Sequence, residues 1–355
     1  PVILGYCDPE VDEAVIEQIS RGVTLSLATR LEMELAELLA DIIPCAEMSR
    51  FGKNGSDATA GAIRLARAYT GRDRVAVCGY HGWQDWYIGT TPRNRGVPAA
   101  VQNLTHVFSY NDLLGLDRVL SAHKGEFAGV IMEPMNAIDP APGYLQGVCD
   151  LAHDHGALFI LDEIITGFRF SLGGAQELFG VTPDLATFGK GMGNGYSISA
   201  IVGRAEIMTL MKDIFFSFTA GGETLGLAAA LATIQKIKDR DVIQHLWRVG
   251  KRVEDSLNQI RRAHDLENCI SLRGKPPWLL LGFSASASCT DWEIKTLFMQ
   301  EMLARGILIQ SSHNLSFAHD DSDIDRLISV YEDVFPILAE AIHNGAMAEF
   351  LNGPP

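Results

Sequence analysis

Short apolar segments that alternate with helix-forming segments over residues 50–205 constrain the fold most strongly. Residues 74–78, 129–132, 158–161 and 199–203 are runs of this kind. Strands of a parallel sheet are buried on both faces, so they are expected as continuous apolar runs bounded by turn residues. Alternation of such strands with helices predicts an α/β domain with a largely parallel sheet.

The chain is long enough to require a second domain. It has 355 residues, more than one simple core usually contains. Residues 30–238 are expected to form the large domain. Residues 239–355, which mix helices with short strands at 279–283 and 307–310, are expected to form a smaller α+β domain. Residues 1–29 are expected to be the remainder of a longer N-terminal region, because they open abruptly on Pro1.

Composition and charge argue against several classes of partner. The net charge is −15, which disfavours nucleic acid and anionic membrane surfaces. No apolar run has the length of a membrane span. The six cysteines are widely scattered without a C-x-x-C pair, so we expect reduced thiols in a cytoplasmic protein and no metal site.

A single lysine, Lys190, stands in a run with glycine at every second position from Gly189 to Gly195. Glycine allows a ligand or another backbone to approach closely, and a lysine in a site of low polarity has a depressed pKa and can form a Schiff base. A mobile surface loop is the alternative. The run lacks the Ser or Thr that follows the lysine of a P-loop, and it lacks the G-x-G-x-x-G fingerprint of dinucleotide-binding domains. Both nucleotide-binding motifs are therefore excluded.

Further polar or aromatic residues follow the predicted strands or open a helix. Tyr80 and Glu133 follow two apolar runs, and Asp162 ends a third. Ligands of α/β sheets bind outside the carboxyl ends of the strands. Gly55 and Ser56 open a helix expected from Ala58, where free N–H groups attract an anion, although Ser is also an ordinary cap.

Together these residues meet the requirements of pyridoxal 5'-phosphate. The cofactor needs a lysine for its aldehyde, a carboxylate for its pyridine nitrogen, an anion cradle and a stacking partner. Lys190, Asp162, Gly55 with Ser56, and Tyr80 supply them in that order. An acid that ends an apolar strand is costly to bury without a cationic partner, which favours this role for Asp162 over a cap.

The same segments resemble the class III (subgroup II) pyridoxal-phosphate aminotransferases of fold type I, and among them the glutamate-1-semialdehyde aminomutases and sugar-aminotransferase-like enzymes. The segments that carry the resemblance are 1–11, Asn54-Gly55-Ser56-Asp57-Ala58, Tyr80-His81-Gly82, Asp162-Glu163-Ile164-Ile165-Thr166-Gly167-Phe168-Arg169, Pro183-Asp184-Leu185 with Gly189-Lys190, and 218–223. The resemblance implies a large domain with a mainly parallel mixed sheet between helices and a smaller C-terminal α+β domain.

The resemblance also implies roles that spacing alone cannot show. Ile164 takes the position that packs on the ring face opposite Tyr80, and His81 and Glu133 complete the predicted cofactor site. Thr219 corresponds to a threonine that reaches the phosphate of the neighbouring subunit. The chain is therefore expected to be a homodimer with shared active sites.

The predicted function is transfer of an amino group from a small amino donor to a small carbonyl acceptor through a Schiff base on Lys190. Departures at Gly221, Glu223 and Thr224 leave the substrate open, and a keto-sugar is one acceptor considered. The alternative is intramolecular transfer, as in glutamate-1-semialdehyde 2,1-aminomutase. The presence of Lys190 argues against a relative that binds the cofactor without catalysis. The absence of a dinucleotide-binding fingerprint argues against a nicotinamide-dependent dehydrogenase. The arginines considered for binding a substrate carboxylate are Arg30, Arg93, Arg95 and Arg169.

Overall fold

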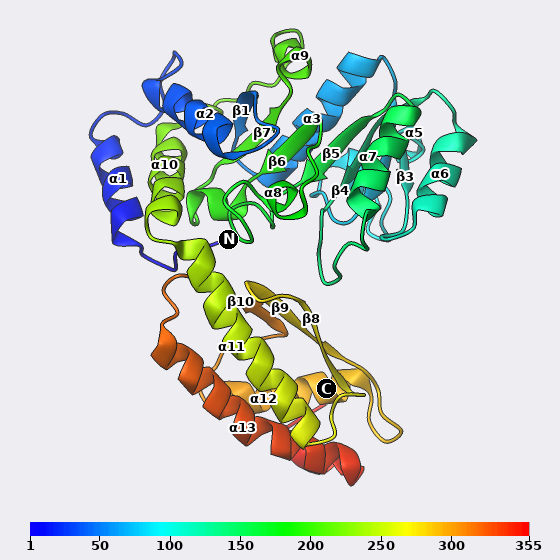
Figure 1. Ribbon diagram of the computed structural model, residues 1–355, viewed down its shortest axis with the longest axis vertical. Coiled ribbons are helices and arrows are strands. Elements are labelled where there is room, and N and C mark those ends of the chain that lie inside the picture. Colours follow the sequence, from blue (N-terminus) through cyan, green and yellow to red (C-terminus); the bar gives the residue numbers. More distant parts are fainter. Residues whose placement is uncertain (355) are drawn as a thin grey trace. The chain divides into compact units, whose positions relative to one another are not determined.

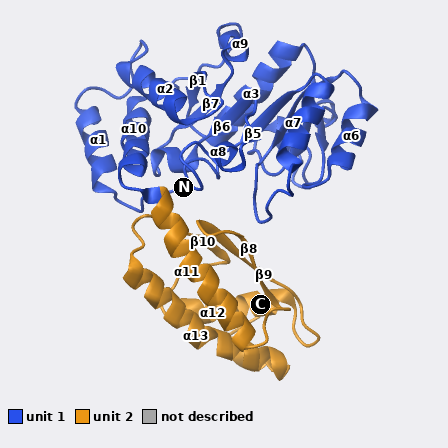
Figure 2. Ribbon diagram, viewed as in Figure 1, with its two compact units in different colours: residues 1–242 blue, residues 243–355 orange. Residues whose placement is uncertain are grey.

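The computed structural model describes residues 1–354 and contains two compact units, residues 1–242 and the chain from Ile243 onward (Figure 2). The first unit is an α/β unit built on a mixed, mainly parallel sheet with helices against it (Figure 1). This confirms the predicted fold class.

The sheet of the first unit has seven strands in the order β1-β7-β6-β5-β4-β2-β3. Its strands are β1 (Met48–Gly52), β2 (Arg74–Cys78), β3 (Thr105–Val107), β4 (Phe127–Met132), β5 (Leu158–Asp162), β6 (Leu185–Phe188) and β7 (Ser199–Gly203). Strands β6, β5, β4, β2 and β3 pair in parallel, and β7 pairs antiparallel with both β6 and β1. The carboxyl ends of β1, β2, β4, β5 and β6 therefore meet at one edge of the sheet.

The helices of this unit connect the strands or precede and follow the sheet. They are α1 (Pro9–Ile19), α2 (Arg30–Ile42), α3 (Gly55–Thr70), α4 (Asp85–Ile88), α5 (Ala99–Gln102), α6 (Leu113–Ala122), α7 (Tyr144–Asp154), α8 (Ala175–Phe179), α9 (Ala205–Met208) and α10 (Thr224–Asp239), with short 3-10 helices η1 (Lys190–Gly193) and η2 (Thr209–Lys212). Helix α10 packs against α1, α2 and η1, so it connects the N-terminal helices to the segment that carries Lys190.

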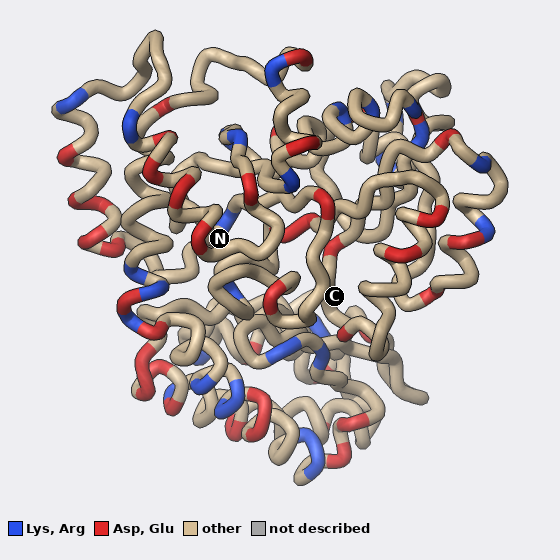
Figure 3. The backbone as a smooth tube through the Cα atoms, turned by 45° about the horizontal axis from the view of Figure 1, so that its top comes forward, with Lys and Arg blue, Asp and Glu red and all other residues tan. Residues whose placement is uncertain are grey.

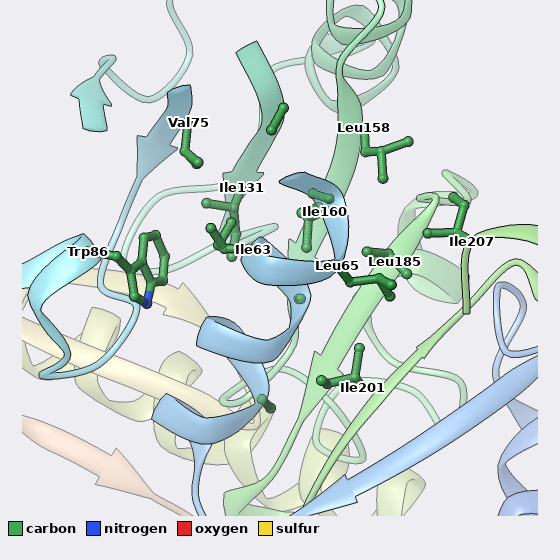
Figure 4. Close-up of a cluster of buried hydrophobic side chains, with 14 of the residues drawn as sticks. Ile63, Leu65, Val75, Trp86, Ile131, Leu158, Ile160, Leu185, Ile201 and Ile207 are labelled. Carbon is green, nitrogen blue, oxygen red and sulfur yellow. The ribbon is translucent and has the colours of Figure 1, made fainter. Parts of the chain in front are cut away.

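Both faces of the central strands are buried. Ile131 of β4 and Ile160 of β5 belong to a hydrophobic cluster with Ile63 of α3 (Figure 4). Val130 and Phe159, their neighbours along the strands, are fully buried as well, and successive side chains of a strand point to opposite faces. This explains why the strands are continuous apolar runs in the sequence rather than alternating ones.

The second unit combines an antiparallel sheet, in the order β10-β9-β8, with long helices. Its elements are α11 (Val242–Ala263), β8 (Ile270–Lys275), β9 (Trp278–Phe283), α12 (Asp291–Ala304), β10 (Ser312–Asn314), α13 (Asp321–His343) and α14 (Met347–Phe350). The buried ring of Tyr331 on α13 packs near Phe298 of α12 and hydrogen-bonds to His313 of β10, 2.6 Å away. Aromatic packing and this bond join the helices of the unit to its sheet.

The observed boundaries agree with most of the predicted elements and correct two of them. Helix α3 begins at Gly55, three residues before the predicted start at Ala58, because Asn54 caps it. The predicted strand at 307–310 is wrong, since the third strand of this sheet is β10 at Ser312–Asn314. Residues 307–310 follow Gly306, which has a φ of +80°, and they belong to no strand pair among the described residues.

Within residues 1–354, no helix is both long and apolar enough to cross a membrane. Lys and Arg are interspersed with Asp and Glu along the chain (Figure 3). The net charge of −15 is therefore spread over many elements.

Candidate active site

Four neighbouring parallel strands deliver the predicted residues to one cavity. Strands β2, β4, β5 and β6 lead into Tyr80, Glu133, Asp162 and Lys190. Ligands of open α/β sheets bind at this edge. The cavity has a volume of about 400 Å³, and its lining is Asn54, Gly55, Ser56, Thr59, Tyr80, His81, Gly82, Trp83, Glu133, Asp162, Ile164, Ile165 and Lys190.

The N-terminus of α3 forms one wall of the cavity. Asn54 caps the helix by accepting from the Asp57 N–H at 3.1 Å, and the Asp57 carboxylate accepts in return from the Asn54 N–H at 3.1 Å. The N–H groups of Gly55 and Ser56 lie in the first turn, where no intrahelical acceptor is available. These groups and the helix dipole suit a phosphate.

Ser56 is held in place by the loop that follows β2. Its Oγ accepts from the Trp83 N–H at 3.3 Å. A Cβ on Gly82, which has a φ of +103°, would lie 2.2 Å from that Oγ. Glycine is thus required at position 82 both for the backbone conformation and for the close approach.

Asp162 is buried, with 3% of its surface exposed, and is oriented by several donors. Its Oδ2 lies 2.8 Å from Nδ1 of His81, and its Oδ1 accepts from the Ile164 N–H at 3.1 Å. Thr187 approaches the same oxygen at 3.4 Å. The other ring nitrogen of His81 lies 3.2 Å from the Cys78 carbonyl, so β2 and β5 jointly fix the position of the carboxylate.

Lys190 begins η1 directly after β6 and has a left-handed backbone, with a φ of +40°. Its side chain reaches solvent through the cavity, yet desolvation by the surrounding protein lowers its pKa below the usual value of 10.5. Asp162 and Glu133 oppose that shift by stabilising the ammonium form. A lowered pKa favours the neutral amine, which is the form that acts as a nucleophile.

Glu133 is a second buried carboxyl group in the cavity. Its Oε2 accepts from the Tyr80 N–H at 3.1 Å. Burial raises its pKa, and the nearby Asp162 carboxylate raises it further. A Cβ on Gly79 would lie 2.4 Å from the same oxygen, so the glycine before Tyr80 makes room for this contact.

The remaining predicted residues divide into those at the cavity and those away from it. Tyr80, 56% exposed, and Ile164, 8% exposed, both line the cavity. Thr219 is exposed and does not line it. The four arginines considered for a substrate carboxylate also lie outside the lining. Arg30 is exposed and pairs with Glu34, whereas Arg169 is only 5% exposed.

The glycine run around Lys190 serves mainly to pack protein against protein. A Cβ on Gly191 would lie 2.8 Å from Cδ1 of Ile3, and one on Gly193 would lie 2.6 Å from Cγ2 of Ile198. Asn194 of the same run accepts from the Leu4 N–H at 2.9 Å and donates to the Gly5 carbonyl at 3.0 Å. The expected close approach is therefore largely that of the N-terminal segment rather than of a ligand.

Sequence reasoning missed some lining residues. Thr59 hydrogen-bonds to the His81 carbonyl at 2.8 Å and lies one turn into α3, which its spacing from Gly55 could have indicated. Trp83 follows the predicted Tyr80-His81-Gly82 segment directly and is 70% exposed at the cavity. Ile165 lies in the segment 162–169 that carries the resemblance, but no role was assigned to it.

The donors and acceptors of the cavity fit pyridoxal phosphate. A lysine amine with a lowered pKa, a buried carboxylate, an aromatic side chain and a helix N-terminus face one space. The glycines at 79 and 82 keep that space open, because side chains there would displace Glu133 and Ser56. The chemistry of this donor set is that of a cofactor with an aldehyde, a basic ring nitrogen and a phosphate.

Comparison with known proteins places the chain in a family. The profile of aminotransferase class-III matches residues 1–319. A 3-aminobutyryl-CoA aminotransferase from Cloacimonas acidaminovorans is 36% identical over 91% of this chain and 80% of its own. A glutamate-1-semialdehyde 2,1-aminomutase from Pelotomaculum thermopropionicum is 34% identical over 96% of this chain and 85% of its own.

Solved structures agree. The FumI protein of Sphingopyxis sp. MTA144, solved with pyridoxal phosphate bound, superposes with a TM-score of 0.90 at 26% identity, over 97% of this chain and 83% of its own. The chain belongs to the class III aminotransferases, which are pyridoxal-phosphate-dependent enzymes.

Proposed function

We propose that Lys190, Asp162 and Tyr80 carry the amino-group transfer in the cavity at the ends of β2, β5 and β6. The observation that supports this most strongly is the convergence of eight predicted site residues on a single cavity of about 400 Å³. Those residues are Gly55, Ser56, Tyr80, His81, Glu133, Asp162, Ile164 and Lys190. Residues 30–238 are proposed as the cofactor-binding domain and residues 239–355 as the small domain.

Each residue has a role that follows from its surroundings. Pyridoxal phosphate, when bound, supplies an aldehyde that takes up the amino group and a ring that stabilises negative charge beside it. Asp162, held by His81, keeps a negative charge fixed where the ring nitrogen would lie. Gly55 and Ser56 would hold the phosphate, and Tyr80 and Ile164 would contact the two faces of the ring.

Lys190 then acts as the general acid and base. Its lowered pKa leaves more of the amine neutral near neutral pH, so it can accept a proton from the substrate carbon and return it elsewhere. Proton transfer by a positioned side chain typically contributes about 10²–10⁴-fold to a rate. The substrates are proposed to be a small amino donor and a small carbonyl acceptor, of which a keto-sugar is one class to test.

We further propose a homodimer in which Thr219 of each subunit contacts the cofactor phosphate that is bound by the other subunit. The exposed position of Thr219, away from the cavity of its own chain, supports this arrangement. A location in the cytoplasm remains the prediction from the scattered cysteines.

One experiment separates transfer between substrates from the intramolecular alternative. The cofactor-loaded enzyme is mixed with L-glutamate and no acceptor, and the visible spectrum and free 2-oxoglutarate are measured. Loss of the lysine-bound absorbance with one equivalent of 2-oxoglutarate supports the proposed transfer. An unchanged spectrum, together with isomerisation of glutamate 1-semialdehyde, would favour the aminomutase reaction that the relative from Pelotomaculum thermopropionicum is named for.

A further inference from the structure

A surface loop of the first unit is tied to the elements that form the phosphate cradle. We call residues 215–223 the Thr219 loop. Arg64 of α3 donates to the Phe215 carbonyl at 2.6 Å, and Arg50 of β1 donates to the Phe216 carbonyl at 3.2 Å. The far end of the loop, at Glu223, is held by Lys53, which lies between β1 and α3.

The contact at Glu223 is a largely buried ion pair. Nζ of Lys53 lies 2.6 Å from Oε2 of Glu223, with 14% and 17% of the two side chains exposed. Nζ also donates to the Ser197 carbonyl at 3.0 Å. A Cβ on Gly226 would lie 3.0 Å from Nζ and 2.4 Å from the Ser197 oxygen, so glycine in α10 leaves the room that this pair occupies.

Glu223 uses its carboxylate to begin α10 as well. It accepts from the Leu225 N–H at 2.7 Å and from the Gly226 N–H at 3.2 Å. Burial acts to raise the pKa of Glu223, but the hydrogen bonds from Lys53 and these N–H groups lower it overall. The carboxylate is therefore charged at neutral pH, and the end of the Thr219 loop is fixed to both Lys53 and α10.

The backbone of Lys53 is fixed in turn by the cap of the phosphate-binding helix. Its N–H donates to the Asp57 carboxylate at 3.1 Å, the same oxygen that accepts from the Asn54 N–H. Lys53 thus joins the cradle of its own subunit, at Asn54, to the base of the Thr219 loop. Phe215 is 79% exposed and Phe218 37% exposed, so the loop presents side chains outward while its backbone is held.

We propose that Lys53 is a positioning residue that holds the Thr219 loop for the phosphate bound by the other subunit, so that each subunit's Lys53 governs cofactor retention by its partner. The proposal rests on the homodimer given under Proposed function. Lys53 does not line the cavity and is not proposed to touch substrate or cofactor. It acts through Glu223 and the loop.

The first test measures cofactor retention rather than turnover. In Lys53→Met holoenzyme, the dissociation constant of pyridoxal phosphate, followed by the visible absorbance of the lysine-bound form, is expected to increase about tenfold, the usual size of a lost hydrogen bond to a charged group. Lys53→Met/Glu223→Gln, which leaves no unpaired charge, should show a similar increase. Lys236→Met is the control, because Lys236 forms a buried ion pair with Asp8, with 9% and 7% of the side chains exposed, away from the loop.

The decisive test uses mixed dimers assembled from two differently tagged chains. Lys190→Ala removes the lysine-bound signal from one subunit, so the absorbance reports only the other. When Lys53→Met and Lys190→Ala are on different chains, the site that keeps Lys190 receives the Thr219 loop of the chain with an intact Lys53. This site should retain cofactor normally. When both substitutions are on one chain and the other chain is unchanged, the remaining site should lose cofactor about tenfold more readily.

The outcomes separate this proposal from the homodimer itself. A monomeric holoenzyme in sedimentation velocity would overturn the homodimer and this proposal together. A dimer with the defect confined to the chain that carries Lys53→Met would overturn this proposal alone, since Lys53 would then act on its own cradle. Unchanged cofactor retention in both Lys53 variants would overturn it as well.

Discussion

Asp162 ends β5, His81 lies in the loop after β2, and the two side chains meet at the cavity. Only 3% of Asp162 is exposed, and its Oδ2 lies 2.8 Å from the His81 ring. Asp162 could be identified from the sequence, because an acid that ends an apolar strand requires a partner. The contact with His81 could not, because 81 residues separate the two in the chain.

Replacing Asp162 with Asn tests the need for a fixed negative charge. The neutral amide retains the shape but cannot stabilise positive charge on the ring nitrogen, so the rate of the first half-reaction should fall by about 10²–10³-fold. Stopped-flow absorbance measures the rate and shows that cofactor is still bound. His81→Gln keeps the carboxylate and should lower the rate less. An Asp162→Asn rate within a few-fold of the native rate would contradict the assigned role.

The buried carboxyl group of Glu133 should make the stability of the cofactor-free protein depend on pH. Its pKa is raised in the folded state above the usual 4.5. Well below pH 4.5 the group is neutral in both the folded and unfolded states, so it does not change the free energy of unfolding. As the pH rises, Glu133 ionises first in the unfolded chain, which lowers the free energy of unfolding. This loss is complete once the pH exceeds the pKa of Glu133 in the folded state.

Glu133→Gln should therefore raise the free energy of unfolding at pH 8 and leave it nearly unchanged at pH 4. The amide can still accept from the Tyr80 N–H. Urea unfolding of the cofactor-free native and substituted proteins at both pH values gives the comparison. Equal stability at pH 8 would show that the carboxyl group carries no such penalty.

At the scale of elements, the segment that carries Lys190 depends on a distant part of the chain. Residues of the N-terminal segment pack where Gly191 and Gly195 lack side chains. The sequence indicated that a ligand or another part of the chain approaches these glycines. It could not indicate which of the two. The packing partner is Ile3, 188 positions away, and a local pattern carries no information about such a contact.

Gly191→Ala tests this packing. The added Cβ would lie 2.8 Å from Cδ1 of Ile3, and such overpacking typically costs about 1–3 kcal/mol of stability. Removing that Cδ1 with Ile3→Val should relieve part of the cost. The free energies of unfolding of the two single variants and the double variant are then compared. The double variant should lose less free energy of unfolding than the two single variants lose in sum. Strict additivity would place the strain elsewhere.

A second pair of glycines separates backbone strain from contact with the site. Gly71 and Gly82 both have a positive φ, but only at Gly82 would a Cβ meet a neighbour, Ser56. Gly71→Ala should cost about 1–2 kcal/mol of stability from the backbone alone and leave cofactor affinity unchanged. Gly82→Ala should cost more and weaken binding of pyridoxal phosphate. Equal affinity in the two variants would show that Ser56 does not help to hold the phosphate.

At the scale of the whole molecule, the sheet could be predicted because its strands are buried on both faces and therefore leave long apolar runs. The start of α3 could be predicted to within three residues from the polar residues that open it. The strand at 307–310 was predicted wrongly, because an apolar segment as short as Ile307–Gln310 does not reveal whether a partner strand is available. The pair of Lys53 and Glu223 joins residues 170 positions apart and left no local pattern.

The proposed chemistry depends most on covalent binding of the cofactor by Lys190. The direct measurement is reduction of the pyridoxal-phosphate-loaded protein with borohydride, followed by peptide mass spectrometry to locate the attached pyridoxyl group. The pyridoxyl group is expected on Lys190 alone, and no stable attachment is expected in Lys190→Ala. Attachment to another lysine, such as Lys53 beside the phosphate cradle, or an unchanged yield in Lys190→Ala, would contradict it.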